Sequence, residues 1–155
     1  MSSKDLLNKQ ETKHNFLWVK FLTRFFLLIS AAYNLIASAW YINRSQYQPA
    51  AIYEKFPKIQ NIDFQYGILC CILFLMFLIC IVLLSYYRRY ADVFLYFCYM
   101  LDIVSTVVYV VLCVYTTKEI GNLGIYKEAF YNIGGCFLLL IINIIYFNKR
   151  SYAFR

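Results

Sequence analysis

Four long blocks of apolar residues follow one another along the chain, and short polar segments separate them. The blocks cover residues 25–42, 66–87, 93–116 and 129–147. Each is close to the roughly 20 residues that a helix needs to cross a hydrocarbon core of about 30 Å. Their apolar residues are unbroken instead of recurring at helix or strand spacing, and the second block has no charged residue. The pattern therefore predicts four membrane-spanning α-helices.

The connectors differ in length, and this predicts the topology. Residues 88–92 alone separate the second block from the third, so these two helices should form a tight antiparallel hairpin. The polar connectors 43–65 and 117–128 should lie together on the opposite side of the membrane, the first being the larger loop. We expect one all-α domain over residues 25–147, an antiparallel bundle of four transmembrane helices.

The segment before the first block is basic and amphipathic. Lys9, Lys13, Lys20 and Arg24 are spaced four, seven and four residues apart, so they share one stripe of a helix, with Trp18 among the apolar residues beside them. A basic stripe beside an aromatic belt residue is typical of a helix that lies in the membrane interface. We therefore assign residues 1–24 to a tail and an interfacial helix that continues into the first span, and residues 148–155 to a basic tail.

Composition and charge support a membrane protein and predict its orientation. The chain is 63% hydrophobic and 15% charged, against about 45–50% and 25% in soluble domains. Ten Lys and Arg residues lie on the side of the two termini and five on the other side, so the positive-inside rule places both termini on the cytoplasmic side. Because the charges lie between the blocks and not on one folded face, we expect no nucleic-acid partner. The basic residues expected at the membrane surface are Lys9, Lys13, Lys20, Arg24, Arg88, Arg89, Lys149 and Arg150.

Asp102 is the acidic residue that falls inside a predicted span, about ten residues into the third helix. A charged carboxylate near the membrane midplane costs at least about 2.5–3.5 kcal/mol, so Asp102 should face the bundle, find partners or be protonated. Two interpretations follow: a proton or cation relay, or a hydrogen-bonded residue that fixes helix packing, which we favour. The other intramembrane polar candidates are Asn34, Ser38 and Asn143, with Asn34 as the natural partner of Asp102.

Small residues and cysteines offer little chemistry. Gly134 and Gly135 should let the fourth helix approach a neighbour closely, or else mark a local break in it. The six cysteines all lie in apolar blocks, no pair forms C-x-x-C, and the one histidine, His14, is far from them in sequence. We therefore expect no metal site and no cofactor, and we interpret the cysteines as small buried hydrophobic residues.

The layout of four helices, cytoplasmic ends, a longer first outer loop and a tight inner hairpin resembles that of the MARVEL-type membrane proteins. Leu101 and Asp102, followed by Ile103 and Val104, are similar to the acid-containing third helix common in that family. The outer-loop cysteines of some members are absent here. The resemblance implies a role in membrane subdomain organisation or vesicle trafficking, with no catalytic residues to carry over.

The expected function follows from this scarcity of chemistry. No G-x-S-x-G or H-E-x-x-H motif is present, so we predict a protein that is not an enzyme. We expect it to associate laterally with other membrane proteins or with itself in the lipid bilayer, as an accessory subunit or a membrane organiser. The alternative is a small proton- or cation-coupled transporter or channel component that uses Asp102. An enzyme acting on a lipid is the least favoured interpretation.

Overall fold

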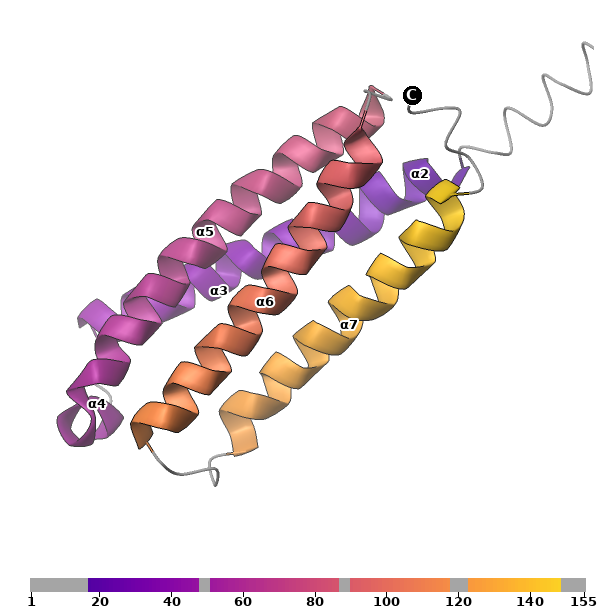
Figure 1. The fold of residues 1–155 in the computed structure, drawn as a ribbon. Helices are drawn as coiled ribbons and strands as arrows, with labels where there is room; N and C mark the ends of the chain where they lie inside the picture. Colours follow the sequence, from indigo (N-terminus) through magenta and orange to yellow (C-terminus); the bar gives the residue numbers. More distant parts are fainter. Residues whose placement is uncertain (1–16, 48–50, 87–89, 118–122, 149–155) are drawn as a thin grey trace, which may run out of the picture.

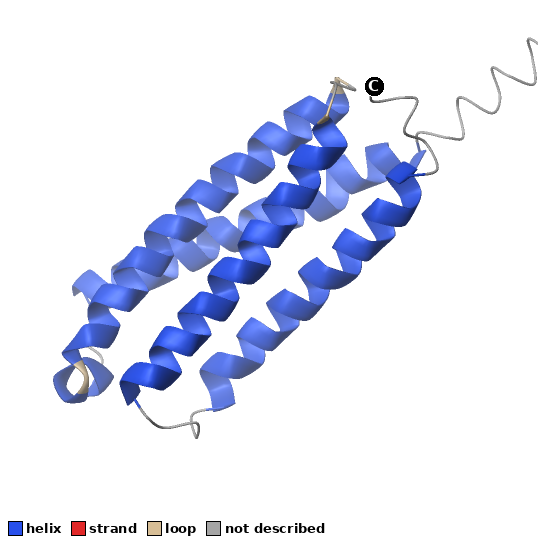
Figure 2. Cartoon of the chain, viewed as in Figure 1, coloured by secondary structure: helices blue, strands red, loops and turns tan. Residues whose placement is uncertain are grey.

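The computed structural model describes residues 17–47, 51–86, 90–117 and 123–148. These ranges are almost wholly helical and contain no strand, as Figure 2 shows. The elements are α2 (Leu17–Phe21), the π-helical turn η1 (Leu22–Phe26), α3 (Leu27–Tyr47), α4 (Ala51–Lys55), α5 (Pro57–Ser85), α6 (Ala91–Thr117) and α7 (Leu123–Asn148).

The four long helices form an elongated bundle (Figure 1). The helices long and apolar enough to cross a membrane are Trp18–Gln46, Pro57–Ser85, Ala91–Thr117 and Ala129–Asn148. The predicted all-α class and its four spans are thus confirmed. Helix α4 lies at one end of the bundle, which we call the α4 end, and the turn between α5 and α6 lies at the other, the hairpin end.

The helices extend beyond the apolar blocks, and the predicted connector 43–65 is therefore too long. Helix α3 continues to Tyr47 and α5 begins at Pro57. A proline is well suited to the first turn of a helix, since its fixed φ is helical and its missing N–H has no partner there in any case. Ile59 and Asp63 are buried against the bundle. Tertiary packing, which hydropathy does not report, makes this polar stretch helical.

The start of the first span belongs to the bundle. Val19 and Leu22 are buried in the apolar core, while Lys20 and Arg24 are exposed. The Thr23 hydroxyl donates to the carbonyl oxygens of Val19 at 2.9 Å and of Lys20 at 3.2 Å. The helix runs on through the π-turn into α3, as predicted, but residues 18–24 are part of the first long helix and not a separate element. Lys9 and Lys13 lie outside the described residues.

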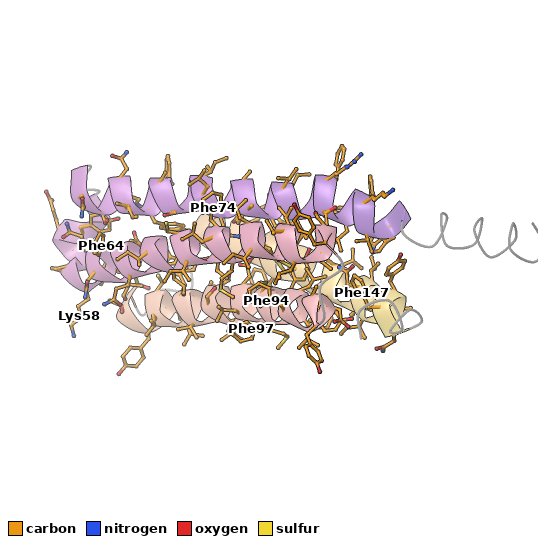
Figure 3. All side chains as sticks on the ribbon, turned by 90° about the horizontal axis from the view of Figure 1, so that it is seen from above. Lys58, Phe64, Phe74, Phe94, Phe97 and Phe147 are labelled. Atoms are coloured by element: carbon orange, nitrogen blue, oxygen red, sulfur yellow. The ribbon has the colours of Figure 1, made fainter. Side chains whose placement is uncertain are left out.

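The interior is mainly apolar at the hairpin end, and most buried polar residues lie toward the α4 end. Phe77, Leu84, Leu95 and Phe147 are almost completely buried at the hairpin end, and Figure 3 shows Phe147 among the helix ends there. The buried polar residues between the middle and the α4 end are Asn34, Ser38, Ser45, Asp63, Asp102, Ser105 and Thr106, whereas those described near the hairpin end are Thr23 and Asn143. This uneven division places the candidate site in one half of the bundle.

The turn between α5 and α6 is short, as the sequence predicts. Helix α5 ends at Ser85 and α6 starts at Ala91. Tyr90 has a φ of 62°, in the left-handed region that side chains with a Cβ rarely adopt. Its carbonyl oxygen accepts the Phe94 N–H at 3.0 Å, which extends the hydrogen bonding of α6 back into the turn. Arg88 and Arg89 lie outside the described residues.

Candidate functional site: two buried carboxylates

Asp102 lies in the middle of α6 and is 2% exposed. Its Oδ2 accepts a hydrogen bond from Asn34 Nδ2 on α3 at 3.3 Å, so the predicted pairing with Asn34 is confirmed. Its Oδ1 accepts from Asn132 Nδ2 on α7 at 3.1 Å, and the Cys136 thiol, also on α7, lies 3.6 Å from Oδ2. One carboxyl group therefore joins three of the four long helices.

Helix α5 joins the same network through Tyr66 and Thr106. The Thr106 hydroxyl donates to the carbonyl oxygen of Asp102 at 2.9 Å. Its oxygen is then left to accept from Asn132 Nδ2 at 3.2 Å and from the Tyr66 hydroxyl at 3.1 Å. Ser105 also donates to the Asp102 carbonyl oxygen, at 2.8 Å. The network around Asp102, which we call the central network, thus contains side chains from all four long helices.

The central network has neutral donors and no cation. Among the described residues, the salt bridge found is between Arg44 and Asp63, and Asp102 has none. No group of three possible metal ligands occurs in the described part of the chain. Amides and hydroxyls can satisfy either a carboxylate or a carboxylic acid, since the amide oxygen can accept the acid proton. The chemistry available at this position is therefore hydrogen bonding and proton binding.

A second buried carboxylate, Asp63, was placed in the outer loop by sequence reasoning. It lies in α5 and is 1% exposed. Oδ2 accepts from the Tyr53 hydroxyl at 2.6 Å and lies 3.9 Å from Arg44 Nε, and Oδ1 accepts from the Tyr109 hydroxyl at 2.9 Å. We call these four residues the Asp63 cluster. It differs from the central network because it contains a cation.

Tyr53 ties α4 to the end of the bundle. Its side chain is buried, and its ring lies 5.7 Å from the guanidinium carbon of Arg44, within the range of a cation–π contact. Burial raises the pKa of Tyr53, and the hydrogen bond to the Asp63 carboxylate raises it further. The phenol therefore stays neutral, and able to donate, over the ordinary pH range.

The two carboxylates are connected through aromatic rings. The rings of Tyr66 and Tyr109 stack with centroids 4.2 Å apart and an angle of 18°. Tyr41 packs edge-on against both rings. Tyr66 belongs to the central network and Tyr109 to the Asp63 cluster, so polar and aromatic side chains continue without a break from the middle of α6 to the α4 end.

The remaining polar candidates lie apart from the side chains that connect Asp102 to Asp63, or beside them. Ser38 is buried on α3, one turn from Asn34. Asn143 is at the hairpin end, where its Oδ1 accepts from Trp18 Nε1 at 3.1 Å and its Nδ2 donates to the Leu139 carbonyl oxygen at 2.8 Å. Asn143 therefore fastens the start of the first span to α7. Of the surface cations, Lys20 and Arg24 are exposed, and Lys149 and Arg150 lie outside the described residues.

Gly134 and Gly135 do not pack against the described part of the chain, in contrast to the close approach expected of them. Both are exposed, and a Cβ added at either position would meet no described atom within 4 Å. They do not break the helix either, since α7 is continuous. Helical spacing explains the difference: Asn132 and Cys136 turn toward Asp102, and the two glycines between them turn outward. A close approach to another molecule stays a prediction.

The close helix approach occurs at Gly67, which the sequence did not single out. A Cβ there would lie 2.8 Å from Cγ1 and 3.2 Å from the backbone nitrogen of Ile42, and 3.2 Å from Cβ of Tyr41. Sequence reasoning also missed Asn132, Tyr66 and Tyr109. The spacing of Ile59, Asp63 and Gly67, four residues apart, could have indicated that the second helix begins before residue 66 and that Asp63 lies on its buried face.

Four apolar helices and an intramembrane polar network define the class: the chain is a multi-pass α-helical membrane protein. Comparison with known proteins finds no matching family model, no matching curated protein and no matching solved structure.

Proposed function

We propose that this membrane protein is not an enzyme and acts through lateral helix association, as an accessory subunit of a complex or as an organiser of the membrane around it. The observation that carries the proposal is the open space at Gly134 and Gly135 on the outer face of α7. Tyr131 and Leu138, one turn to either side, are 70% and 59% exposed. Two glycines between large side chains form a notch in a membrane-spanning helix.

Such a notch suits another helix. Lipid tails are as apolar as leucine, so helices in a bilayer associate through close packing, and small residues allow their backbones to approach. Asp102 supports the same proposal, because Asn34 and Asn132 satisfy its carboxyl oxygens inside the chain. Its network then stabilises the bundle that presents the notch. A role of the MARVEL type, in membrane subdomains or vesicle traffic, is one form this function could take.

Affinity purification in mild detergent, followed by native sizing and mass spectrometry, tests the proposal. Wild-type protein should co-purify with itself or with larger membrane proteins in a fixed ratio. Gly135→Leu should abolish this association, because it fills the notch while leaving the interior untouched. Ala32→Leu, which adds the same side chain on the exposed face of α3, is the matched control and should associate normally. Equal association of the two variants would contradict the proposal.

A second candidate function is a proton- or cation-coupled transporter or channel component. The observation in its favour is the chain of polar and aromatic contacts from Asp102 to Asp63, which reaches the α4 end, while the other half of the interior is mainly apolar. In this case purified protein in liposomes should move protons or a small cation, and Asp102→Asn should abolish the flux. Ser38→Ala, a buried polar residue one turn from Asn34, is the control. A wild-type flux equal to that of empty liposomes would exclude this function.

We further propose that both termini face the cytoplasm. The support is the excess of Lys and Arg on the termini and on residues 88–92. A membrane-impermeant reagent added to sealed, right-side-out membranes should label Lys127, which is exposed near the start of α7, and not Lys20. The opposite labelling would reverse the orientation.

A further inference from the structure

A groove lies between α5 and α6 on the outer surface of the bundle. Its volume is about 280 Å³. Ile62, Gln65 and Leu69 line it from α5, and Leu101, Val108 and Leu112 from α6. The stacked rings of Tyr66 and Tyr109 also line it. Apart from Gln65, Ser105 and these phenols, the lining residues are aliphatic, so the groove suits a hydrocarbon chain.

The groove has the depth of one leaflet. Ile62 lies about 7.5 Å along the axis of α5 from its start at Pro57, at 1.5 Å per residue. On α6 the lining runs from Leu112 to Leu101, about 16 Å along the axis, which compares with about 15 Å for half of a hydrocarbon core. The groove therefore extends from near the headgroup level at the α4 end to about the middle of the membrane.

Lys58 lies one helical turn before the end of the groove that is nearer to α4. Lys58, Ile62, Gln65 and Leu69 are spaced four, three and four residues apart, so they follow one stripe of α5. Lys58 is exposed, and its side chain extends away from the bundle in Figure 3. The nearby carboxylate of Asp63 is buried and paired with Arg44, so it does not neutralise this lysine. A cation one turn above an apolar groove is complementary to a lipid phosphate.

We propose that this groove is a binding site for an anionic phospholipid, with one acyl chain between α5 and α6 and the phosphate at Lys58. The bound chain would contact the Tyr66 and Tyr109 rings, which connect the central network to the Asp63 cluster. Lipid binding would thereby stabilise the stacked arrangement of these rings. The inference goes beyond lateral association and does not depend on it, because the groove and the Gly134–Gly135 notch lie on different helices.

Native mass spectrometry tests the proposal. The full chain is reconstituted in vesicles of equal parts phosphatidylglycerol and phosphatidylcholine, extracted in mild detergent, and weighed with its retained lipid. We expect one retained lipid per chain, with phosphatidylglycerol favoured about fivefold, the preference that one lysine near the surface provides. Val108→Trp should fill the groove and lose the lipid. Val107→Trp, at the same depth but turned away from the groove, should retain it.

The lysine has its own matched control. Lys58→Gln should retain a lipid but bind the two headgroups equally, whereas Lys127→Gln, which removes an exposed lysine from α7, should keep the preference. If Val108→Trp retained as much lipid as Val107→Trp, the assignment of the groove as the acyl-chain site would be wrong. An unchanged preference in Lys58→Gln would overturn the headgroup assignment. Both lysines are exposed, so their variants should fold as the wild type does.

Discussion

The side-chain nitrogen of Asn34 lies 3.3 Å from Oδ2 of Asp102, so a buried hydrogen bond joins the first membrane-spanning helix to the third. Its length is slightly beyond the usual range of about 2.7–3.2 Å for N–H···O bonds. Asn34 Nδ2 also donates to the carbonyl oxygen of Ser30 at 3.0 Å, which holds the amide in position.

Replacement of Asn34 by Ala should lower the free energy of unfolding by about 0.6–2 kcal/mol, the usual range for an interhelical hydrogen bond in a membrane. Unfolding in mixed micelles, followed by circular dichroism, measures the change. Ile36→Ala, on the lipid-exposed face of α3, should cost less because the removed side chain contacts lipid instead of protein. If Ile36→Ala were the more costly change, the hydrogen bond would not be a significant stabilising contact.

The two buried aspartates should differ in reactivity toward a lipid-soluble carbodiimide. In the described part of the chain, Asp102 has neutral hydrogen-bonding partners, whereas Asp63 also lies 3.9 Å from Nε of Arg44. The reagent favours a carboxyl group that has no ion pair, and peptide mass spectrometry locates the adduct. Asp102 should be labelled and Asp63 should not.

Removal of the cation should reverse the behaviour of Asp63. In Arg44→Gln, the Asp63 carboxyl group loses its positive partner and should become reactive toward the carbodiimide. Lys58→Gln removes an exposed cation nearby and should leave Asp63 unreactive. Labelling of Asp63 in the wild type would mean that the ion pair with Arg44 does not protect it from the reagent.

Gly67→Ala should be destabilising, although alanine is the better helix former. The new Cβ would press against Ile42 and against Cβ of Tyr41, and such overpacking typically costs about 1–3 kcal/mol. Gly134→Ala has open space around its Cβ and should gain about 0.5–1 kcal/mol of helix propensity. The two variants are compared by thermal unfolding in the same detergent. A gain in stability for both would show that α3 and α5 are farther apart than described.

The contact between Tyr53 and Asp63 should be lost in alkali. Because the pKa of Tyr53 in the folded protein is raised above the ordinary value of about 10, the phenol stabilises the fold fully below about pH 10. This contribution should decrease as the pH rises above that value, toward the pKa of the folded protein. The difference in thermal midpoint between the wild type and Tyr53→Phe isolates it. A difference that stays constant well above pH 10 would contradict the role of the hydroxyl.

Hydropathy predicts the fold because the spans are determined by length and apolar content alone. The four blocks, the hairpin around residues 88–92 and the single all-α domain depend on nothing else. The ends of the helices depend on something more. Residues 57–65 are mostly polar in sequence, and they are helical because Ile59 is buried and Asp63 finds partners in α3, α4 and α6, which no local pattern reports.

The site is predicted in part for a similar reason. Asp102 stands out because a carboxylate inside an apolar block is costly, and Asn34 follows as a polar residue at a similar depth. Asn132 does not stand out, since its position opposite Asp102 depends on how α7 is rotated about its axis. The apolar residues of α7 surround the helix, so the sequence leaves this rotation open. Once the rotation is known, the outward direction of Gly134 and Gly135 follows from it.

The π-helical turn Leu22–Phe26 changes the direction in which side chains before it point, relative to those after it, from what a continuous α-helix would give. Its wider turn holds an additional residue, so the part before it is offset from the part after it by about 100°. The first part directs Trp18 to Asn143, and the second directs Asn34 to Asp102. Deletion of one residue inside this turn would restore α-helical geometry and keep both contacts, because the removed residue is the one that the wide turn absorbs. The first helix can thus change length by one residue there without turning either of its ends away from its partner.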